Sequence, residues 1–285
     1  MFFEEKKYII EKGRRIFIDI CESGCGNGCL YCYAPYHNEP QKLLKKKQID
    51  AICRYVRDNY CFDNKIISLC PNTEPLKSKK SIELIIYIIK FFSHENCYIQ
   101  ISTKELIPEY FLENIEKDSK SRIYINISVP TIKNSNLIEP NAALAEQRIN
   151  NFLHKKIYDN INFCLYIKPF ILQEQEQELY VDYINRYDID TVCVGPTFNI
   201  DSEIPCISLY DQYKAQKMYS IQISSIDTFI SLLRKKTKAR VFSSSVCCIY
   251  SDYYNECVLK LFDYGEQLCR DCSLKRSLVL NEKDA

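Results

Sequence analysis

Three cysteines near the start of the sequence have the spacing of a metal-binding group. Cys25, Cys29 and Cys32 form the pattern C-x3-C-x2-C, whereas a pattern starting at Cys21 would place Gly28 where the third thiol is needed. Three thiolates on one short loop can hold three corners of a [4Fe-4S] cluster and leave one iron open to a further ligand. Tandem C-x2-C pairs would instead suit a closed zinc site or a ferredoxin-type cluster. The spacing therefore predicts a cluster with an open iron.

Glycine is concentrated around these cysteines. The chain has only six glycines, and three of them, Gly24, Gly26 and Gly28, fall within five positions. Glycine adopts backbone conformations with φ > 0 and allows close approach of other groups. We expect the loop to turn tightly here, so that its amide N–H groups can bond the sulfides of a cluster.

The overall composition is that of a globular protein. Of 285 residues, 46% are hydrophobic and 26% are charged, which excludes collagen-like and disordered classes. The net charge is only +1, so the composition does not favour a protein that coats nucleic acid or a membrane. The most apolar stretch, residues 82–92, is too short to cross a bilayer, so we expect no membrane partner.

Cysteine usage points to a reducing compartment. The first residues mix acids and bases without the apolar segment of a signal peptide, so we expect a cytoplasmic protein. Cytosolic thiols are kept reduced, so sixteen cysteines are read as metal or redox groups rather than disulfides. With only three histidines in the chain, thiolate ligation is favoured.

The elements that must position this loop alternate between strands and helices. Apolar periodicity predicts strands over 15–20, 65–70, 97–102, 122–129, 161–167 and 190–194, with helices over 42–58, 81–92, 108–117, 142–156 and 176–186. Strands joined by helical crossovers form a mostly parallel sheet with right-handed connections. Six such units are too few for a closed eight-stranded barrel, so we predict an α/β fold built as a partial (βα)6 TIM-like barrel. The cysteine loop then lies beyond the carboxyl end of the first strand, where such folds place their chemistry.

The pattern loosens after about residue 195. We therefore predict a core over residues 1–195 and a C-terminal extension over 196–285 that completes the barrel. This extension contains a predicted helix near 223–234, a predicted strand near 240–243 and a cysteine-rich tail.

The cysteine loop resembles the signature of the radical SAM superfamily. That signature is C-x3-C-x-aromatic-C after the first strand of a partial (βα)6 barrel, and here it reads CGNGCLYCYAP with Tyr31 at the aromatic position. The resemblance implies that the open iron chelates the amino and carboxylate groups of S-adenosylmethionine. One electron, from a reductant such as a flavodoxin or ferredoxin, would then split the cofactor and yield a 5′-deoxyadenosyl radical that abstracts hydrogen from a substrate.

Four further segments are similar to the spore photoproduct lyase-like (DNA photolyase-like) branch of that superfamily. They are SLCPNTEPLKS after the second strand, ISTKELIPEYFL after the third, INISVP at the end of the fourth, and LIEPNAALAEQRINNF. Together with the loop they extend the resemblance over most of residues 15–175. The resemblance implies a lyase-like reaction on a nucleic acid or nucleotide.

The same resemblance implies roles for single residues. Glu74 stands near the segment that binds the amino group of the cofactor, although Asn72 and Thr73 replace the two glycines usual there. Asn126 and Ser128 match the region that meets the ribose and methionine of the cofactor.

Two cations complete the cofactor-binding residues that we predict. Lys104 and Arg148 are expected partners for a carboxylate or phosphate group.

Cys70 ends the second strand, and the resemblance places it where the lyase keeps a hydrogen-donating cysteine. The alternative is an ordinary buried cysteine, because free cysteine packs well in protein cores. We interpret Cys164 and Cys193 in this second way.

The tail offers a second candidate metal site. Cys269 and Cys272 form a C-x2-C pair, and Cys257 lies within reach along the chain. The alternative is that these cysteines pack without metal.

Two basic runs remain outside these assignments. We expect them to be solvated helix faces, with a phosphate-binding groove as the alternative. The runs are Lys42, Lys45, Lys46 and Lys47, and Arg234, Lys235, Lys236, Lys238 and Arg240.

Three functions follow from these motifs. The first is a radical SAM enzyme that acts on a nucleic acid or nucleotide. The second is a radical SAM maturase of a peptide or small metabolite, with an auxiliary cluster in the tail. The third is a protein that binds an iron-sulfur cluster or zinc without turnover.

Overall fold

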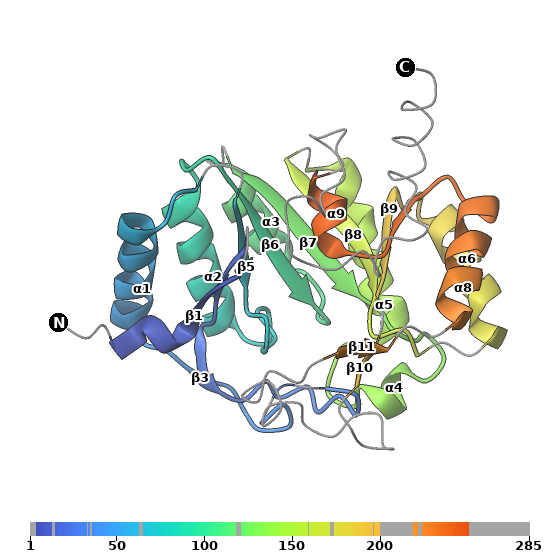
Figure 1. Ribbon diagram of the computed structural model, residues 1–285, viewed down its shortest axis with the longest axis horizontal. Helices are drawn as coiled ribbons and strands as arrows, with labels where there is room; N and C mark the ends of the chain where they lie inside the picture. The colour runs from blue at the N-terminus through green and yellow to red at the C-terminus, as the bar shows by residue number, and fades with distance from the viewer. Residues whose placement is uncertain are drawn as a thin grey trace.

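An eight-stranded sheet forms the centre of the molecule (Figure 1). The computed structural model describes residues 4–12, 15–32, 34, 36–62, 65–117, 121–158, 160–171, 174–195, 197–199, 219–221 and 224–250. In spatial order the strands are β1 (Ile9–Lys12), β2 (Arg15–Ile18), β5 (Lys65–Leu69), β6 (Cys97–Thr103), β7 (Arg122–Ser128), β8 (Ile161–Ile167), β9 (Thr191–Val194) and β12 (Arg240–Phe242). All neighbours from β2 to β12 are parallel, and only β1 runs antiparallel to β2. The predicted α/β fold with a mostly parallel sheet is confirmed, and the sheet stays open because β1 and β12 form its two edges.

Helices connect successive parallel strands. They are α1 (Lys46–Asn59), α2 (Lys79–Phe92), α3 (Glu109–Glu116), α5 (Ala145–Ile149), α6 (Glu174–Arg186) and α8 (Ser224–Lys236). Shorter helical segments are η1 (Glu4–Tyr8), α4 (Ser135–Ile138), η2 (Asn150–Lys156) and α9 (Ser245–Tyr250). Two small antiparallel pairs stand apart from the main sheet: β3 (Cys21–Ser23) with β4 (Lys42–Leu43), and β10 (Thr197–Asn199) with β11 (Tyr219–Ile221).

The predicted first strand is shorter than expected. It ends at Ile18, because the carboxylate of Asp19 accepts hydrogen bonds from the backbone N–H groups of Ile20 (2.9 Å) and Cys21 (3.3 Å). Such side-chain to backbone bonds compete with the sheet ladder and turn the chain. The chain leaves the main sheet here and forms β3, which pairs with β4 in place of the start of the predicted helix 42–58.

The predicted helix 142–156 is also divided. It begins as α5 and continues as the 3-10 helix η2. Within η2, the buried Asn151 accepts a hydrogen bond from the backbone N–H of Ile107 (3.0 Å) and donates one to the carbonyl of Glu105 (3.2 Å). Tertiary bonds to the loop after β6 thus accompany the tightened turn.

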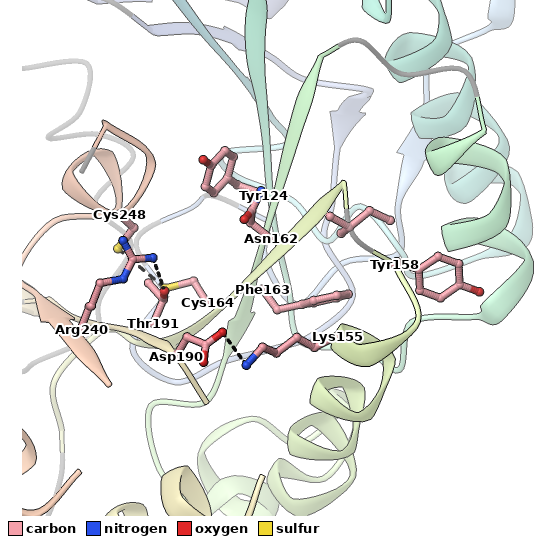
Figure 2. A pocket seen from close by; sticks show the side chains of 11 residues that line it. Tyr124, Lys155, Tyr158, Asn162, Phe163, Cys164, Asp190, Thr191, Arg240 and Cys248 are labelled. Atoms are coloured by element: carbon pink, nitrogen blue, oxygen red, sulfur yellow. Dashed lines mark hydrogen bonds and ion pairs between the residues drawn. The ribbon is translucent and has the colours of Figure 1, made fainter. Parts of the chain in front are cut away.

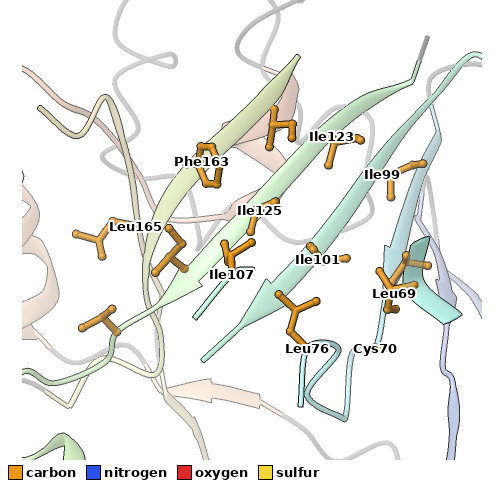
Figure 3. Packing of buried hydrophobic residues seen from close by; sticks show 14 of the residues in the cluster. Leu69, Cys70, Leu76, Ile99, Ile101, Ile107, Ile123, Ile125, Phe163 and Leu165 are labelled. Atoms are coloured by element: carbon orange, nitrogen blue, oxygen red, sulfur yellow. The ribbon is translucent and has the colours of Figure 1, made fainter. Parts of the chain in front are cut away.

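The larger hydrophobic core lies between the sheet and its connecting helices. Figure 3 shows its centre, where branched side chains project from one face of neighbouring strands. Ile99, Ile101, Ile123, Ile125 and Leu165 are all essentially inaccessible to solvent. Burying each aliphatic side chain contributes about 1.5–3 kcal/mol, so this face fixes the strand register on which the site depends.

A second core occupies the opposite face of the sheet, the inner face of the partial barrel. Helix α9 packs there, with Val246, Cys248 and Ile249 against Tyr98 and Tyr124 of the central strands. Cys164 and Cys193 belong to this core, so the prediction that they are packing residues is confirmed. Strand β12 and α9 both follow residue 195, and β12 pairs with β9.

No helix within the described ranges is long and apolar enough to span a membrane. The tail cysteines Cys257, Cys269 and Cys272 lie outside the described residues.

Candidate metal and cofactor site

The cysteine loop occupies the carboxyl end of the parallel strands, as predicted. It follows β3 and turns at Gly24, Gly26 and Gly28, whose φ angles are +79°, +81° and +61°. At Gly24 a Cβ atom would lie 2.1 Å from the carbonyl oxygen of Pro40, so the return segment of the loop leaves no room for a side chain. The expected tight turn is therefore present, and Gly24 is required both by its φ angle and by close packing.

The three candidate ligands are reduced thiols with restricted access to solvent. Cys25 and Cys29 are buried, and Cys32 is half-buried. Burial raises the pKa of Cys25 to about 12 and that of Cys29 to about 11, and it also raises the pKa of Cys32. All three are protonated at neutral pH in the metal-free chain, so metal binding must displace three protons.

The three thiols of the loop form a donor set that suits an iron-sulfur cluster. A single zinc ion, with bonds of about 2.3 Å, draws its sulfur ligands to within about 4 Å of one another. Within the described ranges, no three His, Cys, Asp or Glu side chains are arranged to hold one ion. A [4Fe-4S] cube spreads its ligands over separate corners, and three thiols on a glycine-rich loop fit that donor set.

Glu74 connects the cysteine loop to the end of β6. Its carboxylate accepts hydrogen bonds from the backbone N–H groups of Lys104 (2.8 Å) and Leu76 (3.1 Å), from the hydroxyl of Thr103, and from the Nδ2 of Asn27 (3.5 Å). Asn27 lies between Cys25 and Cys29 and is itself 3% exposed. The structure thus gives Glu74 protein partners on both oxygens and makes it an anchor of the loop.

A second buried carboxylate holds the other end of the loop. Glu139 accepts hydrogen bonds from the hydroxyl of Tyr31 and from Nη2 of Arg148, and Arg148 Nη1 donates to the carbonyl of Ser128. The side chains of Arg148 and Glu139 are fully buried. The predicted residues Tyr31 and Arg148 therefore meet at Glu139, and Arg148 links them to Ser128. Glu139 belongs to the segment LIEPNAALAEQRINNF but was not predicted as a site residue.

Lys104 brings a positive charge to the same place. Its Nζ lies 5.7 Å from the centre of the Tyr31 ring. Burial lowers its pKa, but Cys29 in its thiolate form and the carboxylates of Glu139 and Glu74 outweigh burial and raise the pKa overall. Lys104 is thus a charged ammonium beside the candidate ligands, where it would favour their thiolate forms.

Asn126 and Ser128 end β7 on the inner face of the barrel. Asn126 donates to the hydroxyl of Ser102 (2.9 Å), and the hydroxyl of Ser128 is buried with no hydrogen-bond partner. A buried hydroxyl without a partner costs free energy unless something else satisfies it. Among the predicted cofactor-binding residues, Ser128 and Arg148, whose Nε is likewise buried without a partner in the described part of the chain, therefore have an unmet need for a hydrogen bond.

Cys70 lies at the carboxyl end of β5 in an unusual conformation. Its φ angle is +55°, and it is 4% exposed. Burial, with added repulsion from Asp19 and Cys21, raises its pKa well above the usual range. The thiol is therefore neutral at physiological pH and keeps its hydrogen.

One cavity is found at the opposite, amino-terminal end of the strands. Figure 2 shows this cavity of about 190 Å³, where Lys155 forms an ion pair with Asp190 and Arg240 donates to Thr191 (3.2 Å). Cys164 and Cys248 lie beside it with their sulfurs 3.8 Å apart. Because it lies at the starts of β8, β9 and β12, this cavity is separate from the cysteine loop.

Comparison by sequence identifies no relative. The chain matches no protein-family model and no curated protein.

Comparison by structure identifies the fold. SuiB from Streptococcus suis superposes with a TM-score of 0.54 at 14% identity, over 88% of this chain and 55% of SuiB. It has also been solved with S-adenosylmethionine and with its precursor peptide SuiA. A spore photoproduct lyase variant with bound AdoMet and dinucleoside spore photoproduct superposes with a TM-score of 0.58 at 11% identity, over 80% of this chain and 76% of the lyase.

Both neighbours are radical SAM enzymes, so the chain has the fold of that superfamily and the predicted resemblance is confirmed at the level of fold. The chain spans about half the length of SuiB (55%) and about three quarters of the lyase (76%).

Proposed function

We propose that this chain is a radical SAM enzyme that binds a [4Fe-4S] cluster through Cys25, Cys29 and Cys32. The observation that carries the proposal is the loop itself. Three thiols, two of them buried and one half-buried, stand on a glycine turn at the carboxyl end of a sheet with the radical SAM fold, and two buried carboxylates, Glu74 and Glu139, hold that turn in place.

The residues around the loop support binding of S-adenosylmethionine. When bound, the cluster and this cofactor would supply the one-electron cleavage that yields a 5′-deoxyadenosyl radical. Lys104 would face the carboxylate of the cofactor, and Ser128 would gain the hydrogen bond that its buried hydroxyl lacks. We assign Asn126 and Arg148 to the same side of the site, with Arg148 acting through Ser128 and Glu139.

We further propose Cys70 as a hydrogen donor to a substrate radical. Its neutral thiol and its position at the carboxyl end of β5 support this role. Its strained backbone is of the kind that collects at functional sites. The test is Cys70→Ala, which should leave S-adenosylmethionine cleavage intact and abolish hydrogen return to the substrate.

For the substrate we favour a nucleic acid or nucleotide, with a lyase-like reaction. Spore photoproduct lyase, the kind of enzyme that the sequence motifs resemble, was solved with a dinucleoside photoproduct. The second candidate is a peptide, because SuiB was solved with a precursor peptide and matches most of this chain. In that case the extension over residues 196–285, which we propose completes the barrel with either substrate, would also carry an auxiliary cluster on Cys257, Cys269 and Cys272.

Anaerobic turnover tests the proposal. Reconstituted protein supplied with S-adenosylmethionine and dithionite should release 5′-deoxyadenosine, measured by chromatography. Cys29→Ala should abolish release, whereas Cys61→Ala, which removes an exposed cysteine away from the loop, should not. An intact, iron-loaded protein that yields no 5′-deoxyadenosine would favour the non-catalytic alternative instead.

A further inference from the structure

Five exposed lysines lie on the elements that precede and follow the cysteine loop. This lysine patch consists of Lys7, Lys42, Lys45, Lys46 and Lys47, all exposed to solvent. Lys7 comes from η1, Lys42 from β4, and the other three from the start of α1. Figure 1 shows η1 beside the lower end of α1, and these two helices are in contact.

The lysine patch centres on a single carboxylate, Glu22. Lys42 forms an ion pair with Glu22. The hydrogen bond from Lys42 lowers the pKa of Glu22, partial burial opposes it, and the charges of Lys42, Lys7 and Lys45 lower it further. Three lysines thus lie close enough to one carboxylate to act on it together.

The patch is joined directly to the candidate cluster ligands. Glu22 is in β3, three residues before Cys25, and Ser23 pairs with Lys42 of β4. The return segment is also packed tightly on the loop, since Gly24 has no space between itself and Pro40. A molecule that docks on the lysines therefore contacts the β3–β4 pair from which the cysteine loop emerges.

The lysines at the start of α1 lie at the positive end of the helix dipole, where Lys46 has favourable contacts with Asp50, one turn along, and with the Tyr87 ring at 5.0 Å. Lys45 is its N-cap residue, Lys46 and Lys47 follow in the first turn, and that turn has no acidic residue. The positive end of the helix dipole repels a cation there by about 0.3–1 kcal/mol per residue. The remaining charge is unfavourable for α1 in isolation and is relieved by an anionic partner.

We propose that the lysine patch docks an acidic electron-transfer protein, with a flavin or iron-sulfur group, that reduces the cluster. This inference rests on the proposed function, because it supplies the electron that function requires. One electron leaves the reduced donor and enters the cluster, so the donor is oxidised by one electron, and no bond forms or breaks. Complementary charge would steer this encounter and raise its rate constant by about 10- to 1000-fold at low salt.

The position of the patch favours an electron donor over a nucleic acid. Asn126 and Ser128 lie on the inner face of the barrel, where we place S-adenosylmethionine, so a substrate must reach that face. The patch is carried by η1, β4 and the solvent side of α1, away from the inner face and its α9 core. Contacts between electron-transfer proteins are small and short-lived, so a compact charged surface suffices.

The test compares two charge-matched double variants of the reconstituted full chain. Lys45→Glu with Lys47→Glu reverses the patch, and acids at these positions favour the helix dipole, so α1 should remain folded. Lys235→Glu with Lys238→Glu makes the same change in net charge near the end of α8, at the other edge of the sheet. The probes are an acidic flavodoxin and a fluorescent DNA duplex. Three quantities are measured: the affinity for each probe by fluorescence anisotropy, the rate of cluster reduction by stopped-flow absorbance, and 5′-deoxyadenosine formed with flavodoxin or with dithionite.

Reversal of the patch should weaken flavodoxin binding and slow flavodoxin-driven reduction by about tenfold or more at low salt, with the difference shrinking as salt rises. Dithionite-driven 5′-deoxyadenosine should be unchanged, and the α8 variant should behave like wild type. If both double variants change flavodoxin binding and reduction equally, or neither changes them, the proposed docking surface is wrong. Turnover with dithionite would still support the proposed function in that case. Loss of affinity for a fluorescent DNA duplex with undiminished flavodoxin reduction would assign the patch to nucleic acid and overturn the proposal. If the wild-type protein forms no 5′-deoxyadenosine with dithionite, the proposed function itself is wrong. Any binding of flavodoxin is then only an attraction between opposite charges, so the inference is overturned as well.

Discussion

At the scale of single residues, the site depends on two buried carboxylates that serve as anchors for the loop. Glu139 receives hydrogen bonds from Tyr31 in the cysteine loop and from Arg148 in α5. A buried ion pair loses most when one partner is removed, because the remaining charge is left without compensation. The effect of replacing Arg148 on the free energy of unfolding can therefore be measured without any cofactor.

We expect Arg148→Met to lower the free energy of unfolding of the metal-free protein by about 3–5 kcal/mol. Tyr31→Phe removes one hydrogen bond to a charged group and should cost about 1–3 kcal/mol. Urea unfolding followed by circular dichroism measures both. Adding Glu139→Gln to Arg148→Met should recover part of the loss. If the double variant is no more stable than the single one, Glu139 is not an uncompensated charge in the single variant.

Lys168, at the end of β8, gives a prediction that depends on pH. Burial lowers its pKa to about 8, with Cys193 opposing and Arg15 adding to that shift, against 10.5 as its ordinary value. Between these two values the unfolded state holds more protons than the folded state, so the free energy of unfolding rises with pH there.

Subtracting the unfolding free energy of Lys168→Met from that of wild type isolates this contribution from the buried thiols. The difference should be flat below about pH 7.5 and then rise towards pH 10, with a slope of at most about 1.4 kcal/mol per pH unit. Equilibrium unfolding in urea at several pH values measures it. A flat or falling difference above pH 8 would show that the Lys168 pKa is not depressed.

At the scale of elements, the glycine turn shapes the loop that carries the three thiols, so we expect it to control cluster binding. Gly24 and Gly26 both have φ near +80°, but only Gly24 lacks space for a Cβ atom. A Cβ at Gly26 would meet nothing closer than the end of the Lys77 side chain at 3.6 Å.

Gly24→Ala should therefore abolish or strongly reduce iron binding, whereas Gly26→Ala, which suffers only the backbone strain of about 1–2 kcal/mol, should retain most of it. Iron and sulfide content after anaerobic reconstitution measures the effect. Equal iron content in the two variants would mean that the close approach of Pro40 is not needed for the loop to bind its cluster.

Periodicity predicted the strands and connecting helices because each has one apolar face against the same core. It failed where side-chain polar groups override that pattern. Asp19 stops β2 early by bonding to the backbone of Ile20 and Cys21, and Asn151 binds the backbone after β6 within the 3-10 turn that replaces part of a predicted helix. The pairing of β3 with β4 depends on the loop returning beside itself, which no local pattern encodes.

The same distinction applies to the site. The spacing of Cys25, Cys29 and Cys32 was readable because all three lie in one loop. Glu74, Lys104 and Arg148 were found through family resemblance, but their partners were not, since the bonds to Asn27 and Glu139 join distant segments. Asn27 gave no signal beyond its position between two glycines.

At the scale of the whole molecule, an open sheet separates two kinds of surface. The outer face is an apolar core under the connecting helices, and the inner face combines the α9 core with polar groups such as Asn126 and Ser128 at the carboxyl ends of the strands. The cysteine loop lies at that end. Under the proposed function, an open iron would lie beside the inner face, and the lysine patch would lie on the elements that flank the loop.

The central claim is that three thiols hold a [4Fe-4S] cluster whose fourth iron binds S-adenosylmethionine. The most direct measurement is electron paramagnetic resonance of the reduced, anaerobically reconstituted protein, titrated with S-adenosylmethionine and paired with iron analysis. We predict about four iron atoms per chain from the loop, or about eight if the tail carries a second cluster. The spectrum of the reduced loop cluster should shift when S-adenosylmethionine is added. In Cys29→Ala the signal of this cluster should be absent. A spectrum that the cofactor leaves unchanged, or zinc in place of iron, would contradict the account.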